Sequence, residues 1–303
     1  MAPIIFSILL PMPLGRVNMP AKRSALIVQG GGARGTYAAG VLKILLENDF
    51  SFDEVYGTSA GALLGVEYIT KDKERLLGLI EELCSSKGFI KVQNYFTKGS
   101  IFDFDYLLKK LPKEKLPFRE KEFYESETEF YAVSANVSEN KVAYFSKNDP
   151  HFMDGLASSA SLPPFSKPIE IEGKGYVDGG VFAGIPFERP LRENVSKIVV
   201  ISTREKGYRK KALSKAIKAI CRRQYRKNPA FLKSILNSYR LYNEQMDEMD
   251  KLAEEGRIFV FYPSFPPSVG ITTQNKAKLD ALFSDAEKDA RASLNALKEY
   301  LSK

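Results

Sequence analysis

Residues 25–35 read ALIVQGGGARG, a short apolar run followed by three successive glycines. A run of this length and composition is typical of a strand buried in a parallel sheet. Apolar residues then recur at helical spacing from 37 to 46, so the glycines connect a strand to a helix with one apolar face. A second strand is predicted at 52–56, and Gly57-Thr58-Ser59-Ala60-Gly61 connects it to a second apolar helix. This alternation predicts an α/β fold, with a mainly parallel sheet and helices on both faces.

Four more strands are predicted further along the chain, at 130–137, 142–145, 175–177 and 197–202. Before them, residues 87–127 interrupt the alternation and place nine aromatic side chains among many lysines. We interpret this segment as an insertion that packs over one end of the sheet. It is either a helical elaboration that fills a side core or a lid over a site.

The composition changes after Thr203. A helix is predicted from Asn228-Pro229, which is a favourable start, to Gly256, which is a favourable end. A last strand at 257–262 and a last helix at about 275–301 complete the chain. The expected organisation is a disordered or non-native leader (1–23), a catalytic α/β domain (24–205) and a mostly helical C-terminal extension (206–303).

The first residues carry no convincing targeting signal. No stretch reaches the roughly 18 apolar residues that span a bilayer. The apolar run at 4–10 is bounded by prolines and lacks a basic start, which argues against a signal peptide. Met1 and Met19 are both candidate starts of translation. We expect a cytoplasmic protein, in peripheral contact with the inner face of the membrane if it contacts a membrane at all.

The net charge of +8 is concentrated in one segment. Residues 206–227 hold ten Lys or Arg and no Asp or Glu, and the rest of the chain carries a net charge of −2. Apolar residues between the basic ones suit a helix that lies on anionic lipid, a nucleic-acid contact, or a solvated helix with one face on the core. These three interpretations of the basic segment stay open, although we expect no nucleic-acid partner. The oligomeric state is not indicated.

Gly57-Thr58-Ser59-Ala60-Gly61 fits the pattern G-x-S-x-G between a predicted strand and a predicted helix. A strand that turns directly into a helix holds the central residue in a strained conformation, and the flanking glycines leave room for the neighbouring backbone. The Ser59 hydroxyl would stand at a helix N-terminus, where the helix dipole favours negative charge. We interpret Ser59 as a nucleophile. The alternative is a glycine-rich turn in which Ser59 only caps the helix.

A serine nucleophile needs a base. The single histidine, His151, precedes the best acidic candidate and lies in a predicted loop, so we interpret it as a loop or capping residue. Asp178 ends a predicted strand, at the sheet edge where α/β proteins bind ligands, and Gly179 and Gly180 let the backbone turn sharply. A free aspartate has a pKa of about 3.9, so Asp178 would need burial and a hydrogen bond to Ser59 to act as the base. A plain Asp-Gly turn is the alternative.

The glycine loop at 30–35 has two interpretations. Its backbone amides could converge on one oxygen and form an oxyanion hole. The same loop also fits the G-x-G-x-x-G of a dinucleotide site. A dinucleotide site needs an acidic residue at the end of the second strand, whereas Asp53 and Glu54 stand at its start.

Three motifs in order, GGGARG at 30–35, GTSAG at 57–61 and DGG at 178–180, resemble the patatin-like phospholipase family. The similarity covers about residues 24–205 and includes ASSASLPPF at 157–165. It implies a patatin-like fold and a Ser-Asp dyad that hydrolyses lipid esters without a histidine, a metal or an organic cofactor. Carried over by position, the nucleophile is Ser59, the base is Asp178, and the oxyanion loop contains Gly31, Gly32, Ala33 and Arg34. The supporting motif glycines are Gly30, Gly35, Gly57, Gly61, Gly179 and Gly180.

The expected function is therefore hydrolysis of lipid carboxylic esters, in the manner of a phospholipase A or a lysophospholipase. Two alternatives stay open. One is a nucleotide-binding α/β protein that uses the glycine loop. The other is a non-enzymatic membrane or nucleic-acid adaptor that uses residues 206–227.

Overall fold

The computed structural model describes residues 23–84, 90–91 and 93–303. The leader expected at 1–23 lies outside the described residues, apart from Arg23. Phe89 of the aromatic insertion lies outside them as well.

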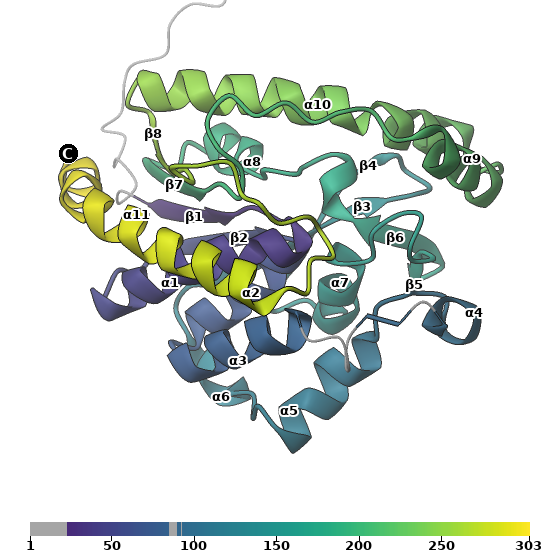
Figure 1. Cartoon of the computed structure of the whole chain (residues 1–303), viewed down its shortest axis with the longest axis horizontal. Helices are drawn as coiled ribbons and strands as arrows, with labels where there is room; N and C mark the ends of the chain where they lie inside the picture. The colour runs from purple at the N-terminus through teal and green to yellow at the C-terminus, as the bar shows by residue number, and fades with distance from the viewer. Residues whose placement is uncertain (1–22, 85–89, 92) are drawn as a thin grey trace, which may run out of the picture.

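In the described part of the chain, eight strands form one sheet at the centre of the molecule (Figure 1). Strands β3, β2, β1, β7 and β8 lie side by side and run parallel, which confirms the mainly parallel sheet. Antiparallel pairing is confined to β4, β5 and β6 beside β3. The strands are β1 (Ser24–Val28), β2 (Glu54–Thr58), β3 (Glu129–Asn136), β4 (Lys141–Ser146), β5 (Ile169–Ile171), β6 (Lys174–Asp178), β7 (Lys197–Ile201) and β8 (Ile258–Phe261).

Helices cover both faces of this sheet (Figure 1). Alternate residues of β1 show why the strand is apolar throughout. Leu26 and Val28 pack in the core that α1, α2 and α11 share, whereas Ala25 and Ile27 pack against α10 on the opposite face. The helices are α1 (Gly35–Glu47), α2 (Ala60–Ile69), α3 (Lys73–Cys84), α4 (Asn94–Lys98), α5 (Leu111–Glu114), α6 (Glu120–Glu125), α7 (Phe152–Ser159), α8 (Glu188–Arg192), α9 (Lys215–Gln224), α10 (Pro229–Glu254) and α11 (Lys276–Ser302), with short turns η1 (Gly32–Arg34), η2 (Tyr106–Lys110) and η3 (Gly179–Val181).

The C-terminal part of the chain joins the same sheet. The predicted last strand is present as β8, which pairs in parallel with β7. The predicted last helix is present as α11, and the Asn275 side chain caps it by accepting the Lys278 N–H at 3.1 Å. Helix α11 lies against α1, where a Cβ on Gly40 would stand 2.7 Å from the Cβ of Ala286. This close approach explains why α1 carries a glycine in the middle of the helix.

The helix predicted within the basic segment is present as α9, but it does not extend over the whole segment. Within 206–227 the helix α9 begins only at Lys215, and residues 206–214 form no helix. The backbone N–H and C=O of Lys210 bond instead to the Asn243 side chain on α10, at 2.8 and 3.2 Å. Strand β5 was not predicted, because three residues are too short to show a strand period.

The carboxyl ends of β2 and β6 meet beside β3. Strand β2 pairs in parallel with β3 as far as Thr58 opposite Val133, and β6 pairs in antiparallel with the next residues, so that Asp178 stands opposite Ser134. Strand β4 fills the other edge of β3 along this stretch. Strands β2 and β6 therefore share one edge of β3 and point toward each other, which brings Ser59 next to Asp178.

Candidate active site

Ser59 stands at a sharp turn between β2 and α2. Its φ of 58° and ψ of −129° lie in a sparsely populated region for a residue with a side chain. Only glycine fits on either side of the turn. A Cβ on Gly57 would lie 2.4 Å from the Cα of Ala62, and a Cβ on Gly61 would lie 2.2 Å from the carbonyl oxygen of Val28. The spacing of the glycines thus has a steric cause, and the strain falls on Ser59.

Ser59 and Asp178 line the same cavity, and the interaction of the Ser59 side chain with the Asp178 carboxyl lowers the pKa of that carboxyl. Asp178 is only 3% exposed and also accepts the Gly180 N–H at 2.7 Å. Burial raises the pKa of Asp178 to about 6, although the hydrogen bonds from Gly180 and Ser59 oppose the rise. A carboxylate with this pKa is a better proton acceptor than free aspartate and is still ionised at neutral pH.

Serines at the end of α7 hold both residues in place. Ser159 Oγ accepts the backbone N–H of Ser59 at 2.9 Å and donates to the Val133 carbonyl at 2.7 Å. The Ser161 carbonyl accepts the backbone N–H of Asp178 at 3.0 Å. The sequence contains this serine-rich stretch, but no sequence argument assigned it a role, because these contacts join segments more than fifteen residues apart.

The glycine loop between β1 and α1 packs directly against the serine. A Cβ on Gly30 would lie 2.8 Å from the Cβ of Ser59. The Thr203 hydroxyl after β7 holds the loop by donating to the Gly30 carbonyl at 2.7 Å. Gly32 has a φ of +56°, and a Cβ there would lie 2.3 Å from the carbonyl oxygen of Ile271.

Two amides of this loop have partners within the chain. The Ala33 N–H donates to the Ile271 carbonyl at 2.8 Å, and the Arg34 N–H donates to the Gly31 carbonyl at 3.2 Å. The amides of Gly31 and Gly32 have no hydrogen-bond partner among the described residues. These two N–H groups are therefore the loop donors that a negatively charged oxygen could use.

A cavity of about 480 Å³ contains Ser59 and Asp178 in its wall. Its volume is in the range of small-molecule sites. The apolar side chains of the wall include Leu63, Phe102, Leu162, Val181 and Ile271.

Cationic side chains also line the cavity, among them Arg34, Arg204 and Lys210. Burial, together with the charge of Arg204, lowers the pKa of Arg34 to about 10. Burial also lowers the pKa of Lys210, despite the opposing charge of Asp178, and the charges of Arg34 and Arg204 add to the lowering. These side chains therefore lie close enough to affect one another.

A sequence profile of patatin-like phospholipases matches residues 26–191, which is more than half of the chain and includes the glycine loop, Ser59 and Asp178. The chain belongs to the patatin-like phospholipase family. Residues 228–302 match a second profile, a domain of unknown function named DUF6363. Arg204 and Lys210 lie between the two matched regions.

Curated relatives share the patatin-like region. The chain is 27% identical over 196 residues to the uncharacterized protein YjjU of Escherichia coli, an alignment that covers 63% of this chain and 55% of YjjU. It is 27% identical over 164 residues to the lysophospholipase nte1 of Aspergillus niger, covering 51% of this chain and 10% of nte1. The chain thus spans about half the length of the first relative and a tenth of the second.

A solved structure shares the fold of this patatin-like chain. The crystal structure of VipD from Legionella pneumophila superimposes with a TM-score of 0.50 at 13% sequence identity, over 91% of this chain and 67% of VipD. At this identity the likeness concerns the fold alone.

Three residues that the sequence analysis considered for a base or for a dinucleotide site lie away from the cavity. His151 precedes α7, and its Nε2 lies 3.2 Å from Glu172 Oε1. Asp53 and Glu54 lie at the amino end of β2, as their place in the sequence predicted. No helix in the described parts of the chain has both the length and the apolar character needed to cross a membrane.

Proposed function

We propose that this patatin-like chain hydrolyses carboxylic esters of lipids through a dyad of Ser59 and Asp178. The observation that carries the proposal is that Ser59, at a strained turn, lines one cavity together with the buried carboxylate of Asp178, whose pKa is raised to about 6. Family membership supports an ester-bond hydrolase, and one relative is named a lysophospholipase.

The reaction runs in two steps. Asp178 takes the hydroxyl proton as Ser59 Oγ attacks the ester carbonyl carbon, and the alcohol leaves with that proton. Water then attacks the acyl-enzyme while Asp178 accepts a proton from the water. The bond between Ser59 Oγ and the acyl carbon breaks, Asp178 returns that proton to Ser59 Oγ, and the fatty acid leaves. The amides of Gly31 and Gly32 stabilise the oxyanion in both steps, and each such donor is typically worth about 10²–10³ in rate. Ala33 would add a third donor only if its contact with Ile271 opened.

The cavity wall supports a lipid as the ester. Its apolar lining residues are suited to an acyl chain, since pockets for small ligands are commonly lined by apolar side chains together with polar groups that orient the ligand. A phospholipase A or lysophospholipase activity fits this arrangement. The exposed basic residues of α9, within 206–227, would support peripheral contact with an anionic membrane surface.

A fluorophosphonate probe tests the proposal. Wild type should be labelled on Ser59, as mapped by mass spectrometry, and should hydrolyse short-chain lipid esters. Ser59→Ala should lose both properties and remain folded. Ser234→Ala, on α10 and bonded to Asn140, is a matched control that should keep both. If Ser59 is not labelled and a dinucleotide raises the melting temperature, the proposal is wrong and the glycine loop is a nucleotide site.

A further inference from the structure

The segment that joins β8 to α11, residues 262–275, contacts the glycine loop. The Ile271 carbonyl accepts the Ala33 N–H at 2.8 Å, and a Cβ on Gly32 would lie 2.3 Å from the same oxygen. The loop thus lacks a side chain at the position where Ile271 approaches it. Because Ile271 lies within the region that matches DUF6363, this contact joins the C-terminal region to the patatin-like one.

Two contacts hold the segment ahead of Ile271. The Ser264 N–H donates to the Asp289 carboxylate on α11 at 3.0 Å, and the Ser264 hydroxyl donates to the other oxygen of that carboxylate. Val269 is 3% exposed and packs in the core that α1, α2 and α11 share. The chain therefore reaches Ile271 from a fixed position.

A turn holds Ile271 itself. The Gly270 N–H donates to Thr273 Oγ1 at 2.7 Å, so residues 270–273 form a closed turn that contains Ile271. Hydrogen bonds of this kind, from the backbone to a nearby side chain, fix the path of a loop. Ile271 is 42% exposed, so packing alone does not hold it. Removal of the Thr273 hydroxyl should therefore loosen the Ile271 carbonyl.

The glycine loop has an anchor on each side of its unpartnered amides. The Thr203 hydroxyl bonds the loop at Gly30, its first residue, and Ile271 bonds it at Ala33. The two amides without a partner among the described residues lie between these anchors in the chain. Glycine loses more conformational freedom on folding than any other residue, and oxyanion donors accelerate a reaction when they are already held in place. A glycine loop that supplies such donors therefore needs anchors.

We propose that the Ile271 carbonyl is a positioning group for the oxyanion hole and is itself held by the turn at 270–273. It fixes one end of the glycine loop and so keeps the two unpartnered amides in place for the oxyanion. This inference rests on the proposed ester hydrolysis at Ser59. It also assigns a role to the region that matches DUF6363, because the segment 262–275 of that region supports the catalytic site of the patatin-like one.

Thr273→Val tests the inference, because valine keeps the shape of threonine and removes the hydroxyl that accepts the Gly270 N–H. We expect kcat for a water-soluble short-chain ester to fall about tenfold, with KM within about twofold. Oxyanion donors act on the transition state, and a displaced donor loses part of the factor of about 10²–10³ that it contributes. Labelling of Ser59 by a fluorophosphonate probe uses the same donors and should slow by a similar factor. Thr273→Ser keeps the hydroxyl and should restore both rates.

Thr128→Val is the matched control. The Thr128 hydroxyl donates to the Phe52 carbonyl at 2.8 Å, ahead of β2 and β3 and away from the cavity. This variant loses one hydrogen bond, as Thr273→Val does, so its melting temperature should fall by at least as much. Neither rate should change, which separates positioning of the loop from a general loss of stability.

Each outcome decides the inference. Unchanged rates in Thr273→Val, or a loss that Thr273→Ser does not restore, would overturn it while leaving the proposed hydrolysis intact. A faster Thr273→Val enzyme would also overturn it, because the Ile271 carbonyl would then compete with the substrate for the Ala33 amide. If wild type neither hydrolyses the ester nor reacts with the probe, the proposed function fails. Hydrogen exchange at residues 30–35 then decides the anchoring by itself: faster exchange in Thr273→Val than in Thr128→Val supports it, and equal exchange rejects it.

Discussion

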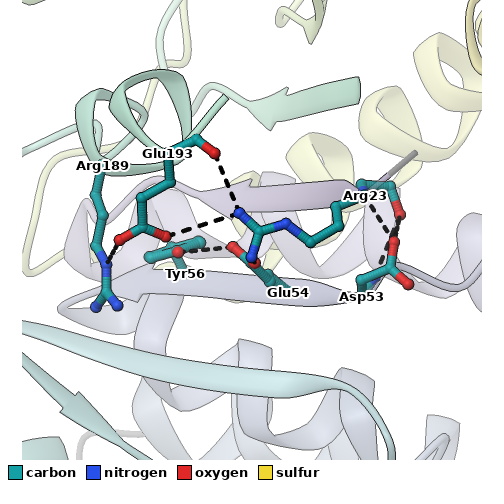
Figure 2. Close-up of polar contacts among 7 residues, drawn as sticks. Arg23, Asp53, Glu54, Tyr56, Arg189 and Glu193 are labelled. Atoms are coloured by element: carbon teal, nitrogen blue, oxygen red, sulfur yellow. Dashed lines mark hydrogen bonds and ion pairs between the residues drawn. The ribbon is translucent and has the colours of Figure 1, made fainter. Parts of the chain in front are cut away.

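At the amino ends of β1 and β2, charged side chains occur in pairs of opposite sign (Figure 2). Arg23 lies 2.9 Å from Glu54, which also accepts the Tyr56 hydroxyl at 2.7 Å. Arg189 pairs with Glu193 at 2.8 Å. Near the carboxyl end of β2, Asp178 at the end of β6 is buried without a cation bonded to it. Arg34, Arg204 and Lys210 line the same cavity and form no ion pair among the described residues.

The contrast separates residues that support the fold from residues that the proposed reaction uses. A buried charge with its partner costs little or contributes stability, whereas an unpaired one and a strained backbone lower stability. Chains keep such unfavourable features mainly where function needs them. Substitutions at the carboxyl end should therefore cost activity, and substitutions at the amino end should cost stability.

The largest effect is expected from Asp178→Asn. An amide cannot accept the Ser59 proton, so kcat/KM for a lipid ester should fall by about 10⁴-fold, the upper end for loss of a general base. Steady-state hydrolysis of a short-chain ester measures it. Asp154→Asn changes a similar Asp-Gly dipeptide at an exposed position in the first turn of α7 and should keep full activity. An Asp178→Asn enzyme with more than a tenth of wild-type activity would exclude Asp178 as the base.

Gly32→Ala should have the next largest effect. The added Cβ would stand 2.3 Å from the Ile271 carbonyl oxygen, so the loop must move and the Gly32 amide loses its position. We expect a rate loss of about 10²-fold, as for one oxyanion donor. Gly173→Ala is matched in its backbone, with a φ of +74° against +56°, but has no atom within 4 Å of the new Cβ. Gly173→Ala should lose about 1 kcal/mol of stability from its positive φ alone, and no activity. Equal rates for the two variants would remove the glycine loop from the mechanism.

The pH dependence should separate activity from stability at Asp178. Its folded pKa of about 6 lies above the unfolded value of about 3.9. The protonated Asp178 carboxyl therefore makes its full contribution to the free energy of unfolding below about pH 4. This contribution, roughly 3 kcal/mol at most, is lost as the pH rises through 6. Activity should follow the opposite course, rising to a plateau above pH 6 as the base ionises.

Urea denaturation of wild type and Asp178→Asn at pH 4.5 and pH 8 measures this linkage. Asp178→Asn should gain stability relative to wild type at pH 8, and the gain should shrink at pH 4.5. A gain that is independent of pH would mean that the carboxylate does not ionise in this range.

The sequence predicted the parts of this site that depend on local geometry. Ser59 and Asp178 could be located because a strand-helix turn requires glycine two positions before and after Ser59, and because glycines follow Asp178 at a strand end. The contribution of Arg204 and Lys210 could not be found in this way. Their segment showed only a basic composition, and its path along the cavity depends on Asn243 of α10, more than thirty residues away. The contact of Ile271 with the glycine loop joins residues still further apart.

Glu54→Gln should have the smallest effect, and it should lower stability rather than activity. Glu54 is 5% exposed, and its replacement leaves Arg23 without its nearest carboxylate. Because the Arg23 side chain is 43% exposed, solvent screens part of the loss, and we expect a decrease of about 1–2 kcal/mol in the free energy of unfolding. Urea denaturation at pH 7.5 measures it, with Glu244→Gln on the exposed face of α10 as a control that should change stability by less than about 0.5 kcal/mol. Hydrolysis by Glu54→Gln should stay within about twofold of wild type, since Glu54 lies at the end of β2 opposite Ser59. A variant that stays fully stable yet loses activity would mean that the paired charges of the amino end also serve the site, and the division between the two ends of the sheet would no longer hold.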